Sequence, residues 1–316
     1  MSQKILISGV KPTGTVHIGN YFGAMKQFID LESSYESYVF IADLHALTSV
    51  QNREQMTQGI LDVALDYLAI GLDPKKTCLF KQSDLPEVTE LAWTFNCITT
   101  MPYLMRAHAF KDAEAKNKEI NVGVFDYPIL MAADILIQNA DVVPVGLDQK
   151  QHIEYTRDIA EKFNHIFGET FKLPEPLIME SVATVLGTDG RKMSKSYGNT
   201  IPLFAEEDEL RKLVMGIVTD SSGGIPENVY VIHKLIKPES ELKDLYESKK
   251  GKYKELKEAL ADDLEAFIAP MRERRKELAK NKDEVLAMLA ENALKIKARI
   301  APKMNEVREK IGVKLD

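Results

Sequence analysis

Two short polar segments of the sequence, about 170 residues apart, contain side chains that are suited to binding phosphate. The first, residues 12–23, contains His17, Gly19 and Asn20. The second, residues 189–199, is flanked by glycines and carries two lysines three positions apart. Lysines act as point charges toward phosphate, and glycine lets a nucleotide approach the backbone closely. Because both segments occur in one chain, they predict a site that binds a nucleotide.

The first segment is predicted to lie at a turn from a strand to a helix. Residues 5–9 read as a buried strand, Pro12 and Gly14 cannot continue a ladder, and a helix should follow from about Ile18. The start of a helix offers free N–H groups and a positive dipole to an anion. His17 could there donate a hydrogen bond to a phosphate oxygen whose charge grows in the transition state. Taken alone, the segment fits an ordinary capped helix with a satisfied histidine better, and it is neither a GxGxxG fingerprint nor a Walker A loop.

The elements around these segments alternate between strands and helices. Residues 38–42, 78–80 and 142–145 read as further buried strands, and residues 54–70 show helical spacing. This alternation predicts an α/β fold with a Rossmann-like, doubly wound parallel sheet that is covered by helices on both faces. Ligands bind beyond the carboxyl ends of such strands, where residues 8–14 and 43–45 should lie. Pro144 predicts that its strand is an edge strand or contains a bulge.

Strand signals fade after Pro202, and apolar residues then recur at helical spacing, as in Leu264, Phe267, Ile268 and Met271 and again in Ile300, Met304, Val307 and Ile311. We therefore expect a catalytic domain over residues 1–200 and a C-terminal helical domain over residues 201–316. Residues 241–316 carry 19 Lys and Arg against 16 Asp and Glu, whereas the rest of the chain carries 22 against 32. The basic tail permits a polyanionic partner, and a solvated helical face explains it equally well.

The composition excludes several classes of protein. A hydrophobic share of 45% with 28% charged residues in 316 positions is typical of a soluble chain of about two domains. No apolar run approaches the roughly 18 residues of a membrane helix, and the start of the chain lacks the features of a signal peptide, so we expect a cytoplasmic protein without a membrane partner. Cys78 and Cys97 have no spacing typical of metal ligands, and we interpret both as small buried hydrophobic residues rather than as a zinc site or a disulfide.

The two polar segments resemble the signature motifs of the class I aminoacyl-tRNA synthetases. Residues 17–20 are similar to the HIGH motif, with Asn20 in place of the second histidine, and residues 192–196 form an intact KMSKS motif. A run of charges is usually solvated surface, but the occurrence of the two motifs together is highly specific. Their order and separation match the small bacterial-type members that activate tryptophan or tyrosine.

Two further stretches resemble tryptophanyl-tRNA synthetases within this class. Residues 127–136 are similar to the helix that selects the amino acid, and residues 146–152 are similar to the GxDQxxH segment. Tyr127, Met131 and Asp134 stand at i, i+4 and i+7 and therefore share one face of a helix. A carboxylate among apolar neighbours needs a partner, which an indole N–H or a Lys or Arg could provide.

The resemblance implies a reaction in two steps. The carboxylate of L-tryptophan attacks the α-phosphorus of ATP, giving tryptophanyl-adenylate and pyrophosphate, and the aminoacyl group is then transferred to the 3′ end of tRNA(Trp). ATP with Mg²⁺, tryptophan and tRNA(Trp) are the implied ligands, and the helical domain would read the anticodon. Relatives are homodimers, with an interface expected from residues 91–118, although the aromatic residues there fit an ordinary core equally well.

The motifs also imply roles for individual residues. The predicted catalytic residues are His17, Lys192 and Lys195. The predicted ATP-binding residues are Lys11, Pro12, Thr13, Gly19, Asn20, Gly146, Leu147, Asp148, Val185, Lys192, Met193, Ser194, Lys195 and Ser196. The predicted amino-acid-binding residues are His45, Tyr127, Met131, Asp134 and Gln149, and no protein-held metal site is expected.

Alternatives remain at this point. Lys11 stands where many relatives carry Gln, which leaves its contact open between ATP and the amino acid. A tyrosyl-tRNA synthetase is disfavoured because Leu130 and Met131 replace the Tyr and Gln that usually surround the hydroxyl of tyrosine. A small-molecule adenylyltransferase would need neither the full KMSKS motif nor the helical tail. A non-catalytic paralogue usually has a damaged signature loop, and this loop is whole.

Overall fold

A five-stranded parallel sheet forms the centre of the computed structural model, which describes residues 3–107, 110–111, 114, 120–146, 149–178, 185–220 and 223–315. The strands are β1 (Ile5–Val10), β2 (Glu36–Ile41), β3 (Thr77–Lys81), β4 (Val142–Val145) and β5 (Glu175–Ile178). Their order across the sheet is β3-β2-β1-β4-β5, so the chain reverses its direction of winding between β1 and β4. The predicted α/β fold with a doubly wound parallel sheet is confirmed.

The predicted strands lie where the apolar runs placed them, but the interpretation of Pro144 is wrong. Strand β4 is interior, between β1 and β5, and its register with β5 is unbroken from Val142 to Val145. It pairs with β1 at Val142, ahead of the proline. Because Pro144 lies beyond this pairing, its missing N–H does not break the ladder, and neither an edge nor a bulge is needed.

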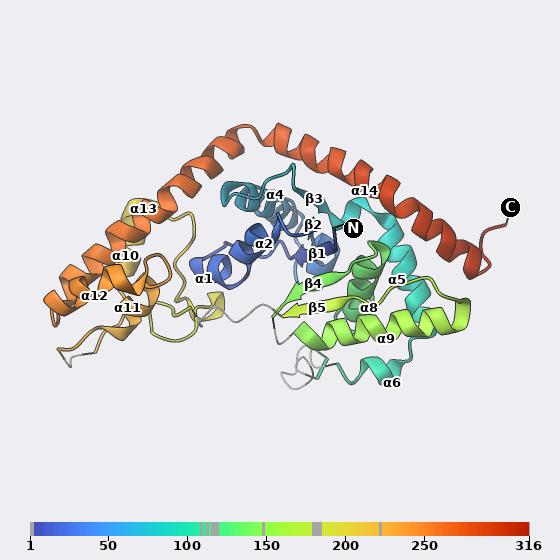
Figure 1. Ribbon diagram of the computed structural model, residues 1–316, viewed down its shortest axis with the longest axis horizontal. Helices are drawn as coiled ribbons and strands as arrows, with labels where there is room; N and C mark the ends of the chain where they lie inside the picture. Colours follow the sequence, from blue (N-terminus) through green and yellow to red (C-terminus); the bar gives the residue numbers. More distant parts are fainter. Residues whose placement is uncertain are drawn as a thin grey trace.

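Helices cover both faces of the sheet (Figure 1). In the first half of the chain they are α1 (Ile18–Asn20), the π-helical turn η1 (Tyr21–Met25), α2 (Lys26–Leu31), α3 (Asp43–Ala46), α4 (Arg53–Ala69), the 3₁₀ turn η2 (Gln82–Asp84), α5 (Pro86–Ile98), α6 (Met101–Leu104), α8 (Val122–Ile137) and α9 (Lys150–Phe167). Successive residues of β2 face opposite cores: Val39 and Ile41 pack with α4, whereas Tyr38 and Phe40 pack with α5 and α8.

The last third of the chain is helical, as predicted. After the 3₁₀ turn η4 (Lys195–Tyr197) it forms α10 (Glu207–Met215), α11 (Glu227–His233), α12 (Glu239–Ser248), α13 (Tyr253–Lys280) and α14 (Lys282–Lys310). The two long helices α13 and α14 arch over the sheet, and α10, α11 and α12 gather around the start of α13 (Figure 1).

Helix α14 packs against the sheet rather than against α10–α12. Its apolar stripe, which includes Ile300, Met304 and Val307, belongs to the same core as α5, α8 and α9. Asn292 donates a hydrogen bond to the backbone oxygen of Leu79 in β3 at 2.9 Å. The predicted helical spacing is therefore confirmed, while the boundary at residue 200 stays a prediction about which parts act as domains.

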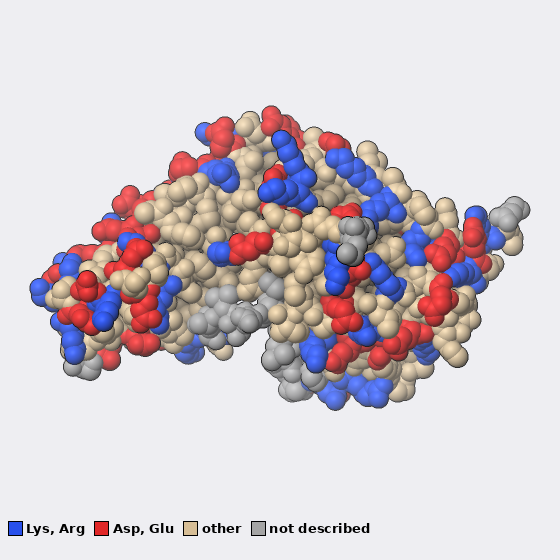
Figure 2. All heavy atoms as spheres, viewed as in Figure 1, with Lys and Arg blue, Asp and Glu red and all other residues tan. Residues whose placement is uncertain are grey.

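Acidic and basic side chains alternate over the helical tail on the face seen in Figure 2. Several of them form pairs one turn apart, such as Lys254 with Glu258 and Lys295 with Glu291. Cys78 is half-buried, whereas Cys97 is exposed, so the prediction of a buried side chain is wrong for Cys97. The buried stripe of α5 runs through Leu91 and Phe95, and Cys97 lies off it. Among the described residues, no helix is long and apolar enough to cross a membrane.

Candidate active site

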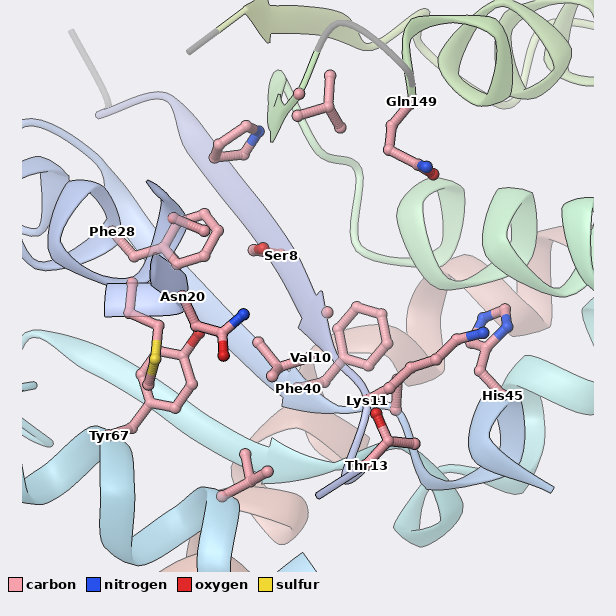
Figure 3. Close-up of a pocket in the computed structure, with 18 of the residues that line it drawn as sticks. Ser8, Val10, Lys11, Thr13, Asn20, Phe28, Phe40, His45, Tyr67 and Gln149 are labelled. Atoms are coloured by element: carbon pink, nitrogen blue, oxygen red, sulfur yellow. The ribbon is translucent and has the colours of Figure 1, made fainter. Parts of the chain in front are cut away.

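A cavity of about 600 Å³ opens at the carboxyl ends of β1 and β4, where the winding of the sheet reverses. This is the place at which open α/β sheets bind ligands. The turn after β1, helix α8 and the loop that contains Lys195 all contribute to its walls. In Figure 3, Lys11, Thr13 and His45 lie on one side of β1, whereas Asn20, Phe28 and Tyr67 lie on the other.

One end of the cavity is lined by helix α8. Tyr127, Met131 and Ile135 face it from successive turns, so two of the three residues predicted to share this face line the cavity and Ile135 takes the place of Asp134. The hydroxyl of Tyr127 is 2.8 Å from Nε2 of His152, which fixes the ring. Lys11 reaches over this ring, with Nζ 5.5 Å from the ring centroid, so a cation lies at the edge of a largely apolar slot.

Asp134 lies behind this wall and is fully buried. Gln82 Nε2 donates to both of its carboxylate oxygens, at 2.8 and 2.9 Å, and His45 Nε2 is 2.9 Å from Oδ2. Burial raises the pKa of the Asp134 carboxyl, and the contacts with His45 and Gln82 oppose this shift. The Asp134 carboxylate therefore has hydrogen-bond partners within the protein. They are a histidine and an amide, and not a Lys or Arg.

The turn after β1 holds His17 in an apolar setting. The His17 backbone N–H donates to Asn20 Oδ1 at 3.2 Å, and the His17 carbonyl accepts from the Asn20 backbone N–H at 2.8 Å. The side chain is buried, and its Nδ1 has no partner among the described residues. Burial, together with the charge of Lys195, lowers the pKa of His17 to about 4. The imidazole is therefore neutral near pH 7 and has an unused polar atom.

Gly19 makes room for this histidine. A Cβ at position 19 would lie 2.9 Å from His17 Nδ1 and 3.3 Å from Met193 Sδ. The absence of a side chain therefore lets both signature segments close on each other at this point.

The second segment is a tight loop that is pinned by Asn199, a residue that the sequence reading did not single out. The buried Asn199 side chain accepts from Ser194 N at 2.8 Å and donates to the Lys192 carbonyl and to Asp189. A Cβ on Gly187 would clash with it at 2.3 Å, so the glycine is required here. These bonds hold the backbone of the loop and do not involve the side chains of its two lysines.

The fold brings the two segments into direct contact. Lys195 Nζ donates to the Thr13 carbonyl at 2.7 Å, and Ile18 N donates to the Ile201 carbonyl at 3.0 Å. Lys195 lines the cavity, and burial lowers its pKa. Both lysines are exposed, but Lys192 does not line the cavity. The arrangement thus supplies cations beside an apolar slot, which suits a ligand that joins phosphates to a flat side chain.

Comparison with known proteins identifies the family. The sequence model described as tRNA synthetases class I (W and Y) matches residues 2–295. The chain belongs to this family. It is 48% identical to a tryptophan–tRNA ligase of Fusobacterium nucleatum and 45% identical to one of Rhodopirellula baltica, over 98% of this chain and 98–99% of the relatives. The crystal structure of tryptophanyl-tRNA synthetase from Campylobacter jejuni complexed with ADP and tryptophan is similar, with a TM-score of 0.92, 43% identity and coverage of 98% and 99%.

The predicted site residues of this class I synthetase fall into three groups. Those that line the cavity are Lys11, Thr13, Asn20, His45, Tyr127, Met131, Gly146, Gln149 and Lys195. Those that are described but lie off its walls are Pro12, His17, Gly19, Asp134, Val185, Lys192, Met193, Ser194 and Ser196. Leu147 and Asp148 lie outside the described residues. Their roles toward ligands remain predictions for all three groups.

The sequence reading of this synthetase missed the wall that α4 provides. Val63, Asp66 and Tyr67 line the cavity from this helix, and Asp66 is the charged residue among them. Burial raises the pKa of Asp66 to about 6, against the opposing effect of Arg275. A signal was present, because Asp66 stands inside the apolar run Val63-Ala64-Leu65-Asp66-Tyr67-Leu68, where an unpaired charge would be costly.

Proposed function

We propose that this chain is a tryptophan–tRNA ligase, which forms tryptophanyl-adenylate from tryptophan and ATP and then esterifies tRNA(Trp). One observation carries the proposal: a single cavity joins the slot beside α8 to the signature lysine Lys195. The relatives named above are tryptophan–tRNA ligases, and their names supply the amino acid. The substrate carboxylate is already a nucleophile, so the protein's task is to position it and to stabilise charge.

The amino-acid end suits an indole. Its walls are the flat ring of Tyr127 and the apolar side chains of Met131 and Ile135. We propose that the indole N–H reaches Asp134 behind this wall, because a carboxylate offers about four acceptor positions and the bonds to His45 and Gln82 use three of them. A phenylalanine side chain would leave the remaining position unused, and sites of this kind reject such analogues by about 10⁴-fold.

The nucleotide end supplies positive charge from lysine side chains. Lys11 and Lys195 line the cavity and can contact the phosphates, and His17 can donate a hydrogen bond to an oxygen that gains charge. No group of three His, Cys, Asp or Glu side chains that could hold a metal occurs among the described residues. We propose that Mg²⁺ arrives bound to the phosphate oxygens of ATP, as is usual for this ion.

Surfaces away from the cavity would bind the tRNA and the second subunit. Trp93, Met101 and Met105 are 71%, 66% and 47% exposed, and Val122 is 79% exposed, so these residues suit a homodimer interface, whereas Phe95 is core. The helical tail, residues 201–316, would read the anticodon of tRNA(Trp). These assignments rest on the family resemblance, whereas the cytoplasmic location is an expectation from the sequence alone.

ATP–pyrophosphate exchange with each of the twenty amino acids in turn tests the proposal. The assay isolates adenylate formation and needs no tRNA. Exchange with tryptophan alone supports the proposed reaction and the selectivity of the α8 slot. Exchange with tyrosine instead would favour the tyrosyl alternative, and exchange with no amino acid would contradict the proposed first step.

A further inference from the structure

Helix α4 turns one face toward the nucleotide end of the cavity. Gly59, Val63 and Asp66 stand at i, i+4 and i+7 on this face. A Cβ on Gly59 would lie only 2.6 Å from the Pro12 carbonyl oxygen, so the glycine allows the helix to lie directly against the turn after β1. Asp66 is thereby carried into the cavity wall, beside the residues of that turn.

A cation from the C-terminal tail holds Asp66 from behind. Arg275 of α13 donates from Nε to Asp66 Oδ1 at 2.5 Å and from Nη2 to Asp62 Oδ1 at 2.7 Å. Its guanidinium also lies over the ring of Phe204, with 5.3 Å between Cζ and the ring centroid. Phe204 follows the signature loop, so Arg275 touches both α4 and the segment that leads out of the loop.

The charge in front of Asp66 is Lys195. Both residues line the same cavity, and Lys195 reaches across the turn after β1 to the Thr13 carbonyl. Their charges act on each other through the partly buried space between them, since Asp66 favours the protonated form of Lys195 and Lys195 favours the ionised form of Asp66. Asp66 Oδ2 has no hydrogen bond among the described contacts, which leaves it free to act on Lys195.

We propose that Asp66 is a positioning residue, which directs the Lys195 ammonium group into the cavity, and that Arg275 fixes Asp66 from helix α13. This inference rests on the proposed function. Asp62 provides a natural comparison, because it binds the same arginine from the same helix but is 39% exposed and does not line the cavity. Loss of a contact with Arg275 is common to changes at both aspartates, whereas a positioning role belongs to Asp66, which lines the cavity.

The decisive experiment compares Asp66→Asn with Asp62→Asn in ATP–pyrophosphate exchange. We expect Asp66→Asn to lower kcat about tenfold and to leave the KM for tryptophan within about twofold, because the charge acts on the phosphate-binding lysine and not on the α8 slot. Asp62→Asn should leave kcat within about twofold. Equal losses in both variants, or a loss confined to the KM for tryptophan, would overturn the proposal.

A double-mutant cycle tests whether Asp66 acts through Lys195. In single-turnover measurements, adding Asp66→Asn to Lys195→Ala should change the rate by less than about twofold, since the group that Asp66 positions is gone. An undiminished tenfold loss in that background would overturn the proposal. If Asp66→Asn does not fold, Arg275→Lys serves instead: it keeps the charge but loses the forked contact, and its kcat should fall while the KM for tryptophan stays constant. Loss of all exchange in the wild-type chain would instead refute the proposed function.

Discussion

At the amino-acid end of the cavity the polar side chains come from helices, whereas at the nucleotide end Lys195 and the backbone that it contacts come from turns. Asp134, His45 and Gln82 form a closed and buried set of hydrogen bonds. The turns of the nucleotide end pass through glycines with positive φ, which include Gly14 at +68° and Gly190 at +80°.

This difference indicates a division of labour. The amino-acid end is pre-organised, because its polar groups already have partners and cannot move without losing them. Lys195 is held at the other end by one bond to a backbone carbonyl, which a phosphate oxygen can replace. Mutations at the amino-acid end should therefore affect stability and substrate choice, and mutations at the nucleotide end should affect rate.

The largest effect is expected for Lys195→Ala. Removing one charge that stabilises the transition state should lower the rate of adenylate formation by about 10²–10³-fold, with tryptophan affinity nearly unchanged. Single-turnover adenylate formation and equilibrium binding of tryptophan measure the two quantities separately. Lys192→Ala is the informative partner variant, since Lys192 is exposed and off the cavity wall. Equal losses of rate and affinity in Lys195→Ala would contradict the division of labour.

Asp134→Ala should act in the opposite way. It would leave buried donors on Gln82 and His45 without their acceptor, at a cost of about 2–4 kcal/mol in the free energy of unfolding. The KM for tryptophan should rise as well, because the wall of the slot depends on this network. Urea denaturation followed by circular dichroism gives the stability, and Lys195→Ala is the control, whose midpoint should not move. An unchanged midpoint for Asp134→Ala would show that these hydrogen bonds do not contribute to the stability of the protein.

Gly59→Ala sharpens the comparison at the contact between α4 and the turn after β1. The added methyl group would lie 2.6 Å from the Pro12 carbonyl oxygen, so the turn must shift. Alanine is the better helix former by roughly 1 kcal/mol, but overpacking costs typically 1–3 kcal/mol, and we expect a small net loss of stability. The KM for ATP should rise about fivefold while the KM for tryptophan stays constant. Gly23→Ala, which meets nothing within 4 Å, is the matched control.

The sequence predicted the sheet well because each buried strand is a short apolar run bounded by turn residues. Residues 5–9, 38–42 and 142–145 each overlap an observed strand. A proline costs a strand a hydrogen bond only where its missing N–H would have paired with a neighbouring strand. The sequence does not show that pairing, and the prediction for Pro144 was therefore wrong. A similar limit applies to α14, since an apolar stripe predicts a buried face but does not say which core will bury it.

The residues of the candidate site could be predicted only where they belong to a recognisable motif. The contact of Lys195 with Thr13 joins two signature segments, whereas Asp134 finds Gln82 and His45 at separations of 52 and 89 residues, which no local pattern encodes. Asp66 was missed for the same reason, because its partner Arg275 lies 209 residues away. Long-range pairs of polar residues are properties of the folded chain.

The acid limb of the pH profile distinguishes Asp66 from His17 at the nucleotide end. Burial, together with the charge of Asp62 on α4, raises the pKa of Asp66 to about 6 against the opposing effects of Arg275 on α13 and of Lys195, whereas His17 has a pKa of about 4. If the ionised carboxylate positions Lys195, kcat should fall as the pH drops through 6, to about a fifth of its plateau at pH 5, because the protonated form keeps about a tenth of the activity. Asp66→Asn should abolish this limb and leave a low, flat profile between pH 5 and 7. A limb that persists in Asp66→Asn would belong to another group, and the charge of Asp66 would then have no part in the rate.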